Sequence, residues 1–409
     1  MTKKSFKNSI QPVHVLAALF LCFILYVGAA AVPAFLKNTL QTLQEPLNPL
    51  GYIQKINEQY SGMLETGKKY AFFQNKGTYI NLNGAMARLF RQPAMNERVT
   101  LKNGHLSRVL PEEPNPEEIR QAADNIIQFH NAHTASGGDF LFVMVPSQIS
   151  KYEDLLPAGY TDTTNATADT FLTMLQASGV PYLDLREELE ADGISITDAY
   201  YSTDHHWNIQ TAFWAYGKIL DALTEIKAIE PVDSFFTDPE NYIFETYENS
   251  FLGSSGKRTG IYYAGVDDSV LLRPAFDTEI SVSIPQLEVN LTGRYEDVSY
   301  NTDIAPDFGD PNFFGDNIYG SYGWGDTQIT HWRNENAPIQ EKFLLIGESF
   351  GNVPFSLMSL CFSSCDEIDM RHFTEDFSQY YHSYRPETVV LLFYVRNTIS
   401  EFTDTSYLG

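Results

Sequence analysis

Three short apolar runs constrain the fold of this 409-residue chain more than any other feature. The runs cover residues 140–145, 343–346 and 388–394. Each is too short for a buried helix and too uniformly apolar for a strand with one face in water. Segments with helical spacing of apolar residues accompany them, at residues 116–133, 168–177, 209–223 and near 354–360. Short buried strands that alternate with helices predict an α/β fold, with a mostly parallel sheet and helices on both faces.

Two regions depart from this alternation. Residues 225–335 are rich in Gly, Pro, Asn and Asp and contain two β-like runs, so we interpret them as a β-containing insertion within the α/β core. Residues 37–75 are polar and contain prolines, which predicts a stalk in front of a domain spanning residues 76–409. Near the start of that domain, Asn103-Gly104 predicts a β-hairpin within residues 98–110.

The N-terminal segment has the pattern of a membrane anchor. Residues 13–36 contain no charged side chain, and as a helix they would be roughly 36 Å long, enough to span a bilayer. Three lysines and no acid precede them, so the positive-inside rule keeps residues 1–12 as a cytoplasmic tail. We expect a single-pass transmembrane signal anchor with the main domain extracytoplasmic. A cleaved signal peptide is the alternative, because Ala29–Ala31 offers small residues for cleavage.

The charge of the chain excludes some partners. Acidic residues number 52 and basic residues 27, which gives a formal net charge of -25. A field of this sign repels phosphate backbones, so we expect no nucleic-acid partner. It also disfavours a strongly anionic polymer as substrate, unless a local groove reverses the sign. Three cysteines cannot form a disulfide framework. The pair Cys361 and Cys365 could form one disulfide or remain two buried thiols.

One polar segment, Asp204-His205-His206-Trp207, immediately precedes the predicted helix 209–223. In an extended backbone Asp204 and His206 would face one side and His205 the other. A carboxylate beside an imidazole fixes its tautomer and stabilises the imidazolium formed during base catalysis. The alternatives are a helix entry capped by the aspartate and a metal site formed by Asp204, His205 and His206.

A second segment, Gly347-Glu348-Ser349-Phe350-Gly351, follows the strand 343–346 and precedes a helix. A serine on such a turn presents its hydroxyl, and the backbone N–H groups of the helix start can stabilise an oxyanion. The alternative is a structural turn with glycines at positive φ. Few residues follow Ser349, fewer than the α/β-hydrolase order of Ser, acid and His requires. We therefore predict that Ser349 uses the upstream residues Asp204 and His206.

These two segments together resemble the DHHW proteins and their relatives, the alginate acetylation proteins J and X, which have SGNH-hydrolase-like domains. In these relatives an Asp-x-His motif precedes the serine, an order permuted relative to ordinary SGNH hydrolases. By this resemblance Asp204 and His206 match the Asp-x-His pair, and Ser349 matches the nucleophile. Glu348 stands where aspartate is commoner. Asn397, after the last strand, is a candidate for the oxyanion-binding asparagine.

The resemblance also implies a function. Such relatives act in O-acetylation of exported or cell-wall polysaccharides, often beside a membrane-bound O-acyltransferase. We therefore expect acyl transfer to a polysaccharide acceptor by Ser349, His206 and Asp204, with no cofactor and no metal. The acidity of the chain favours a neutral or cationic glycan over a polyanion such as alginate. A polysaccharide acetylesterase and a catalytically silent glycan-binding scaffold are the alternatives.

Overall fold

The computed structural model describes residues 12–42, 49–68 and 76–403, which divide into two compact units after Leu82. The first unit contains α1 (Pro12–Thr42), α2 (Pro49–Lys68) and the start of α3 (Lys76–Leu89). The predicted anchor, residues 13–36, lies within α1, while residues 1–11, 43–48 and 69–75 of the predicted tail and stalk lie outside the described residues. Within the described part of the chain, we find no helix with the length and apolar character needed to span a membrane.

The second unit is built around a central sheet. Among the described residues it has eight strands in the order β5-β4-β13-β11-β12-β10-β8-β9. Five strands run parallel: β4 (Asp139–Val145), β5 (Tyr182–Asp184), β11 (Ile339–Gly347), β12 (Phe362–Ile368) and β13 (Thr388–Tyr394). Three antiparallel strands extend one edge: β8 (Ile280–Ile284), β9 (Val289–Gly293) and β10 (Ile329–Arg333). The predicted α/β class with a mostly parallel sheet is confirmed.

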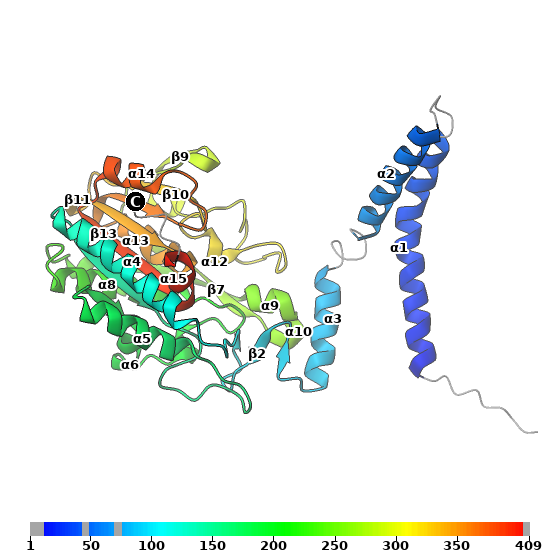
Figure 1. Cartoon of the computed structure of the whole chain (residues 1–409), viewed down its shortest axis with the longest axis horizontal. Coiled ribbons are helices and arrows are strands. Elements are labelled where there is room, and N and C mark those ends of the chain that lie inside the picture. The colour runs from blue at the N-terminus through cyan, green and yellow to red at the C-terminus, as the bar shows by residue number, and fades with distance from the viewer. Residues whose placement is uncertain (1–11, 43–48, 69–75, 404–409) are drawn as a thin grey trace, which may run out of the picture. The chain divides into compact units, whose positions relative to one another are not determined.

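Helices cover both faces of this sheet, as the composition of the two cores shows. Alternate residues of β4 enter different cores. Phe140 and Phe142 pack with α4 (Pro116–Ala135) and α5 (Thr164–Ala177). Leu141 and Val143 pack in the core that includes α8 (Ile209–Glu225) and α13 (Asn352–Met358). In Figure 1, α4 and α15 (Val395–Phe402) lie together over the face of the sheet that carries Phe140 and Phe142, and the two helices are in contact.

Smaller elements complete the second unit. A three-stranded sheet contains the predicted hairpin, and Gly104 in its turn has a φ of 91°. Its strands are β1 (Ala94–Met95), β2 (Arg98–Thr100) and β3 (Leu106–Ser107). A separate antiparallel pair is formed by β6 (Tyr242–Phe251) and β7 (Asp267–Pro274). The remaining helices are α6 (Leu185–Ala191), α7 (Ile196–Ala199), α9 (Ser254–Thr259), α10 (Ile261–Ala264), α11 (Tyr295–Val298), α12 (Ile318–Ser321) and α14 (Phe377–Tyr384).

The sequence did not decide whether Cys361 and Cys365 form a disulfide. In the structure both are free thiols and both are buried. Cys365 lies in β12, and Cys361 lies just before this strand. The Cys361 thiol lies 2.9 Å from the hydroxyl of Tyr216 on α8, and burial raises the pKa of Cys361 to about 12. Both thiols therefore serve as packing groups in the core.

Candidate active site

Ser349 lies directly beyond the carboxyl end of β11. The strand ends at Gly347, Glu348 remains extended with φ -130° and ψ -177°, and a short 3-10 helix spans Ser349–Gly351 before α13. The two glycines are required by packing: a Cβ on Gly347 would lie 2.7 Å, and one on Gly351 2.6 Å, from the ring of Phe355. The alternative from the sequence was a structural turn whose glycines have positive φ. Gly351 has a φ of -72°, so this alternative does not explain it.

The Asp204–His206 loop is held by side chains from other elements. The Asp267 carboxylate, at the start of β7, accepts hydrogen bonds from the backbone N–H and the hydroxyl of both Ser202 and Thr203, at 2.6–3.0 Å. From the carboxyl end of β4, the Gln148 amide donates to the carbonyl of Tyr201 at 3.0 Å and to that of Asp204 at 2.7 Å. These bonds satisfy the polar backbone of a loop that is largely buried.

The three predicted site residues form one hydrogen-bonded chain. His206 Nδ1 lies 2.5 Å from Asp204 Oδ1, and His206 Nε2 lies 2.7 Å from Ser349 Oγ. Asp204 is 4% exposed and His206 is 7% exposed, so the bonds lie away from bulk water. Hydrogen bonds of this length between serine, imidazole and carboxylate allow the ring to take the serine proton. The fold therefore brings together residues that lie 143 positions apart.

Several donors hold Asp204 in its ionised form. Burial alone would raise the pKa of this carboxyl group, but the two neighbouring histidines and the backbone N–H of Ser254 lower it well below its usual range. Gly253 allows the close approach of this loop, because a Cβ there would lie 2.3 Å from Asp204 Cβ. Asp204 can therefore orient the His206 ring and stabilise its protonated form.

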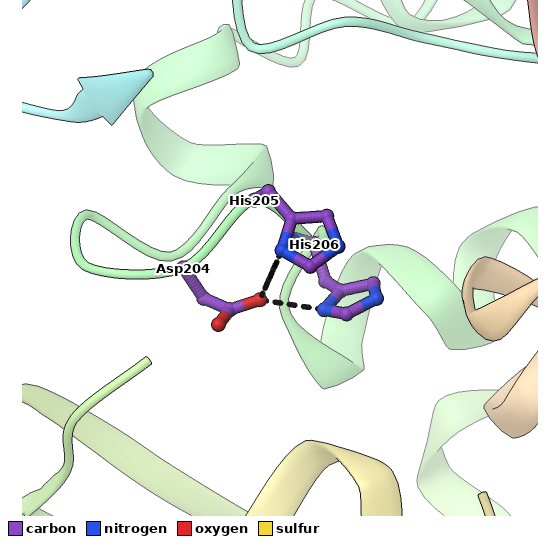
Figure 2. Close-up of side chains that lie close together, drawn as sticks. All are labelled: Asp204, His205 and His206. Carbon is purple, nitrogen blue, oxygen red and sulfur yellow. Dashed lines mark hydrogen bonds and ion pairs between the residues drawn. The ribbon is translucent and has the colours of Figure 1, made fainter. Parts of the chain in front are cut away.

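The sequence-based placement of His205 is wrong. In an extended backbone its side chain would face away from the site, but the His205 and His206 rings have centroids 3.8 Å apart. Figure 2 shows both rings next to the same carboxylate oxygen of Asp204. The reason is a turn, in which the Asp204 side chain accepts the backbone N–H of His206 at 3.0 Å. His205 Nδ1 also lies 2.9 Å from the hydroxyl of Ser254, and the side chain is 53% exposed.

An aromatic wall supports His206. The Tyr319 ring stacks on the imidazole with a centroid distance of 4.0 Å and an interplanar angle of 12°. Trp207 Nε1 donates a hydrogen bond to the Tyr319 hydroxyl at 3.0 Å. Tyr319 lies on α12, within the insertion. Trp207 therefore positions the ring that stacks on His206. The sequence reasoning missed Tyr319, because nothing in its local sequence distinguishes it from other tyrosines.

Glu348 and Asn397 form a second polar pair next to the serine. Glu348 is 4% exposed, and its carboxylate accepts the backbone N–H of Tyr394 at 2.6 Å and a hydrogen bond from the Asn397 side chain. Burial raises the pKa of Glu348 to about 7, and these two donors offset part of that effect. One amide hydrogen of Asn397, the asparagine considered for the oxyanion, is therefore used by Glu348.

Asn352 is a polar residue of the site that sequence reasoning missed. It is 3% exposed, begins α13 and lines the same cavity as Ser349 and His206. Its amide nitrogen is buried without a hydrogen-bond partner among the described residues. A buried unpaired donor beside a serine is a candidate to bind a developing oxyanion. Its position three residues after Ser349, within the Ser-Phe-Gly-Asn run, was the available signal.

Ser349 lines two cavities. The first, of 830 Å³, also contains His206, Tyr319 and Asn352, and the second, of 450 Å³, extends toward β2 and α9. A cavity of 850 Å³ elsewhere in the described chain lies between α4 and α14, and none of the three predicted residues lines it. The polar groups converge on Ser349, so we place the site there.

Two described clusters have the residue types of a metal site. The first is Asp204, His205 and His206, the alternative that the sequence raised. His206 Nδ1 is within hydrogen-bond distance of Asp204, and His206 Nε2 is within hydrogen-bond distance of Ser349. This arrangement fits a proton relay. The second cluster is Asp326, Asp369 and His372. There Asp369 pairs with the Arg371 guanidinium at 2.5 Å, which already neutralises its charge.

Comparisons with known proteins agree with the fold and the motif. Residues 106–236 match the family model of the SGNH hydrolase-like domain of the acetyltransferase AlgX, a segment that contains Asp204 and His206. No curated protein sequence matches this chain. The structure of Bacillus cereus PatB1 has a TM-score of 0.62 and 19% identity, covering 76% of this chain and 98% of PatB1. PatB1 with a sulfonyl adduct gives a TM-score of 0.60 at 19% identity, covering 75% of this chain and 99% of that one.

A DHHW family protein from Eubacterium siraeum is also similar in structure. Its TM-score is 0.57 at 18% identity, and the match covers 76% of this chain and 95% of that protein. At these identities the structural matches show a shared fold. The predicted resemblance is confirmed: residues 106–236 match the family model of the AlgX SGNH hydrolase-like domain, and the chain shares the fold of a DHHW family protein.

Proposed function

We propose that this protein transfers an acyl group, most simply acetyl, to a hydroxyl of an exported or cell-wall polysaccharide, with Ser349 as nucleophile, His206 as general base and Asp204 as the residue that orients it. The observation that carries this proposal is the hydrogen-bonded chain from Asp204 to Ser349, at 2.5 and 2.7 Å. The match to a domain described as that of an acetyltransferase supports the choice of acyl group.

The first half-reaction forms an acyl-enzyme. Ser349 Oγ attacks the carbonyl carbon of the acyl donor while its proton moves to His206 Nε2. Asp204 stabilises the imidazolium that results. The N–H groups at the start of the Ser349–Gly351 helix and the Asn352 amide are the candidate donors to the oxyanion. The tetrahedral intermediate then collapses, and the leaving group departs with the proton from His206.

In the second half-reaction a glycan hydroxyl attacks the acyl carbon. His206 takes the hydroxyl proton and returns it to Ser349 Oγ as the new ester leaves. Water in place of the glycan would make the same residues an acetylesterase. We propose the transferase reaction because two cavities meet at Ser349, which leaves room for a donor and an acceptor. By the family resemblance, a membrane-bound O-acyltransferase is the partner that would supply acyl groups.

The test is labelling of Ser349 with a sulfonyl fluoride, followed by mass spectrometry. We expect labelling of the native protein, none in Ser349→Ala and a loss of about 10³-fold or more in rate in His206→Ala. His205→Ala is the matched control, from the same loop, and should change the rate less than tenfold. A severe loss in His205→Ala with little effect in His206→Ala would show that we have assigned the wrong histidine.

Acetyl transfer from p-nitrophenyl acetate to an oligosaccharide separates the remaining alternatives. Acetylated sugar supports the transferase, whereas free acetate at the same yield with and without sugar supports an esterase. A native protein that neither labels nor releases acetate would favour the silent scaffold. Ser349→Ala removes the hydrogen bond to His206 Nε2, so its free energy of unfolding should change by about 1 kcal/mol or less.

A further inference from the structure

The 450 Å³ cavity on one side of Ser349 has an unusual lining for so acidic a protein. Five arginines surround it, each from a different part of the second unit. They are Arg98 on β2, Arg108 after β3, Arg258 on α9, Arg371 after β12 and Arg396 on α15. We call this cavity the arginine pocket. The chain has only 27 basic residues against 52 acidic ones, so five arginines at one cavity are a marked local concentration of cations, although Arg371 is paired with Asp369.

Three of these arginines lack an acidic partner. Arg98, Arg108 and Arg258 form no ion pair with any residue that the structure describes, although Arg98 Nε donates to the hydroxyl of Ser255 at 3.0 Å. Burial and then the neighbouring Arg258 and Arg108 lower the pKa of Arg98, while Glu97 and Asp204 act in the opposite direction. Like charges that lie close together raise the free energy of the folded state.

The other two arginines are held in place by bonds that leave donors free. Arg371 binds Asp369 through Nε and Nη2, which fixes the plane of its guanidinium. Arg396 donates from Nη2 to the Thr163 hydroxyl at 2.6 Å, while its Nε is buried without a partner in the described structure. The acid that lines the pocket, Glu348, is buried and already accepts two hydrogen bonds.

The cavity on the other side of Ser349 has a different character. Its lining includes amides and aromatic rings, such as Asn301, Gln328 and Trp324, which suit uncharged sugar hydroxyls and ring faces. Its charged side chains are of both signs, Lys257 and Arg371 against Asp204 and Asp326, whereas those of the arginine pocket are mainly cationic. Guanidinium groups bind carboxylates and phosphates through paired hydrogen bonds, and they do so more strongly than neutral donors.

We propose that the arginine pocket binds an anionic group, a carboxylate or a phosphate, carried by the glycan that is acylated at Ser349. The proposal rests on the proposed function for the identity of the reaction, and it names the charge of the substrate. The negative net charge of the chain then acts against polyanions in general, while the local cations select a glycan whose anionic group lies close to the hydroxyl to be acylated.

The test compares three probes on the full-length protein by calorimetry: tetragalacturonate, neutral galactotetraose and galactotetraose bearing one phosphate. At least one anionic probe should bind tenfold or more tightly than the neutral tetramer, and its affinity should fall as salt rises from 50 to 500 mM. If one of the two anionic probes binds more tightly, it identifies the bound anionic group as a carboxylate or a phosphate. Equal affinity for all three probes would overturn the proposal.

The variant for this test is Arg108→Gln/Arg258→Gln, because both side chains are exposed and unpaired in the described structure. Affinity for the preferred anionic probe should fall at least tenfold, and affinity for galactotetraose should not change. Arg294→Gln is the matched control, since Arg294 is also exposed but pairs with Asp277 and Glu296 outside the pocket. If the double variant binds the anionic probe as tightly as the native protein, or if the control loses as much affinity, the arginine pocket is not the binding site for the anionic group.

Sulfonyl labelling of Ser349 in the native protein keeps this test separate from that of the proposed function. If the native protein does not label at all, the proposed acyl transfer fails, whereas the difference in affinity between charged and neutral probes still decides whether the pocket binds anions.

Discussion

Glu348 carries a carboxyl group whose charge is unfavourable in the fold. Its burial raises its pKa from the usual range near 4.5 to about 7. Between about pH 4.5 and 7 the folded protein keeps a proton that the unfolded chain has lost. The stability contributed by the protonated form is therefore present at low pH and is lost as the pH rises through this window, by roughly 3 kcal/mol in total.

The corresponding prediction uses Glu348→Gln, which keeps the shape of the side chain and removes its titration. The free energy of unfolding of the native protein should fall between pH 4.5 and 8 relative to that of the variant. Urea unfolding at several pH values measures this difference. The exposed Glu335→Gln serves as control and should follow the native curve. Parallel curves for Glu348→Gln and the native protein would contradict the raised pKa.

Asn352 gives a second prediction at the scale of the residue. Its amide nitrogen has no partner in the described structure, so Asn352→Ala breaks no hydrogen bond of that nitrogen. If the amide binds the oxyanion, acylation of Ser349 by p-nitrophenyl acetate should slow by about 10²-fold or more. The melting temperature, measured on the same preparation, should change little. An unchanged rate with a lower melting temperature would make Asn352 a packing residue.

The sequence identified the three residues of the hydrogen-bonded chain but placed their neighbour His205 incorrectly. Asp204, His206 and Ser349 were predicted because their residue types and local motifs are specific. His205 was misplaced because a pattern of alternation assumes an extended strand, whereas the Asp204 side chain forms a turn by accepting the N–H of His206. The short spacing that makes this motif recognisable is also what allows the turn.

At the scale of the elements, the site depends on how closely the loop before α9 approaches the Asp204 loop. Gly253→Ala would place a Cβ 2.3 Å from Asp204 Cβ and 2.5 Å from Oδ2. The carboxylate must then move, so we expect sulfonyl labelling of Ser349 to slow by about 10²-fold. Gly293→Ala is the control, because the nearest atom to its added Cβ lies at 3.5 Å. Equal labelling rates in the two variants would show that the loop can adjust.

The buried strands and the long helices were predictable because their patterns are strong. The run 388–394 coincides with β13, and the helix expected at 116–133 is α4, which extends to Ala135. Strand β12 was missed, since its sequence contains serines and the acids Asp366 and Glu367. The two acidic side chains are buried, and tertiary contacts hold them there, such as the 2.6 Å ion pair between Asp366 and Arg333 of β10.

At the scale of the whole molecule, we predict that the full-length chain sediments with membranes and that a chain lacking residues 1–75 is released into the soluble fraction. The physical reason is the uncharged segment 13–36, and the compact second unit begins only after Leu82. The shortened chain should still label at Ser349. A native product that is shorter than the full chain and soluble would instead indicate a cleaved signal peptide.

The sequence by itself determined the α/β class, the three residues of the hydrogen-bonded chain and the acidity of the chain, because these depend on local patterns and on composition. Only the tertiary structure decided that two cavities meet at Ser349 and that five arginines surround one of them. These arginines come from five separate segments of the chain between Arg98 and Arg396, and none has a local signature. Charge along a sequence is summed over the whole chain, whereas a ligand responds to the charges that the fold places within a few ångströms of it.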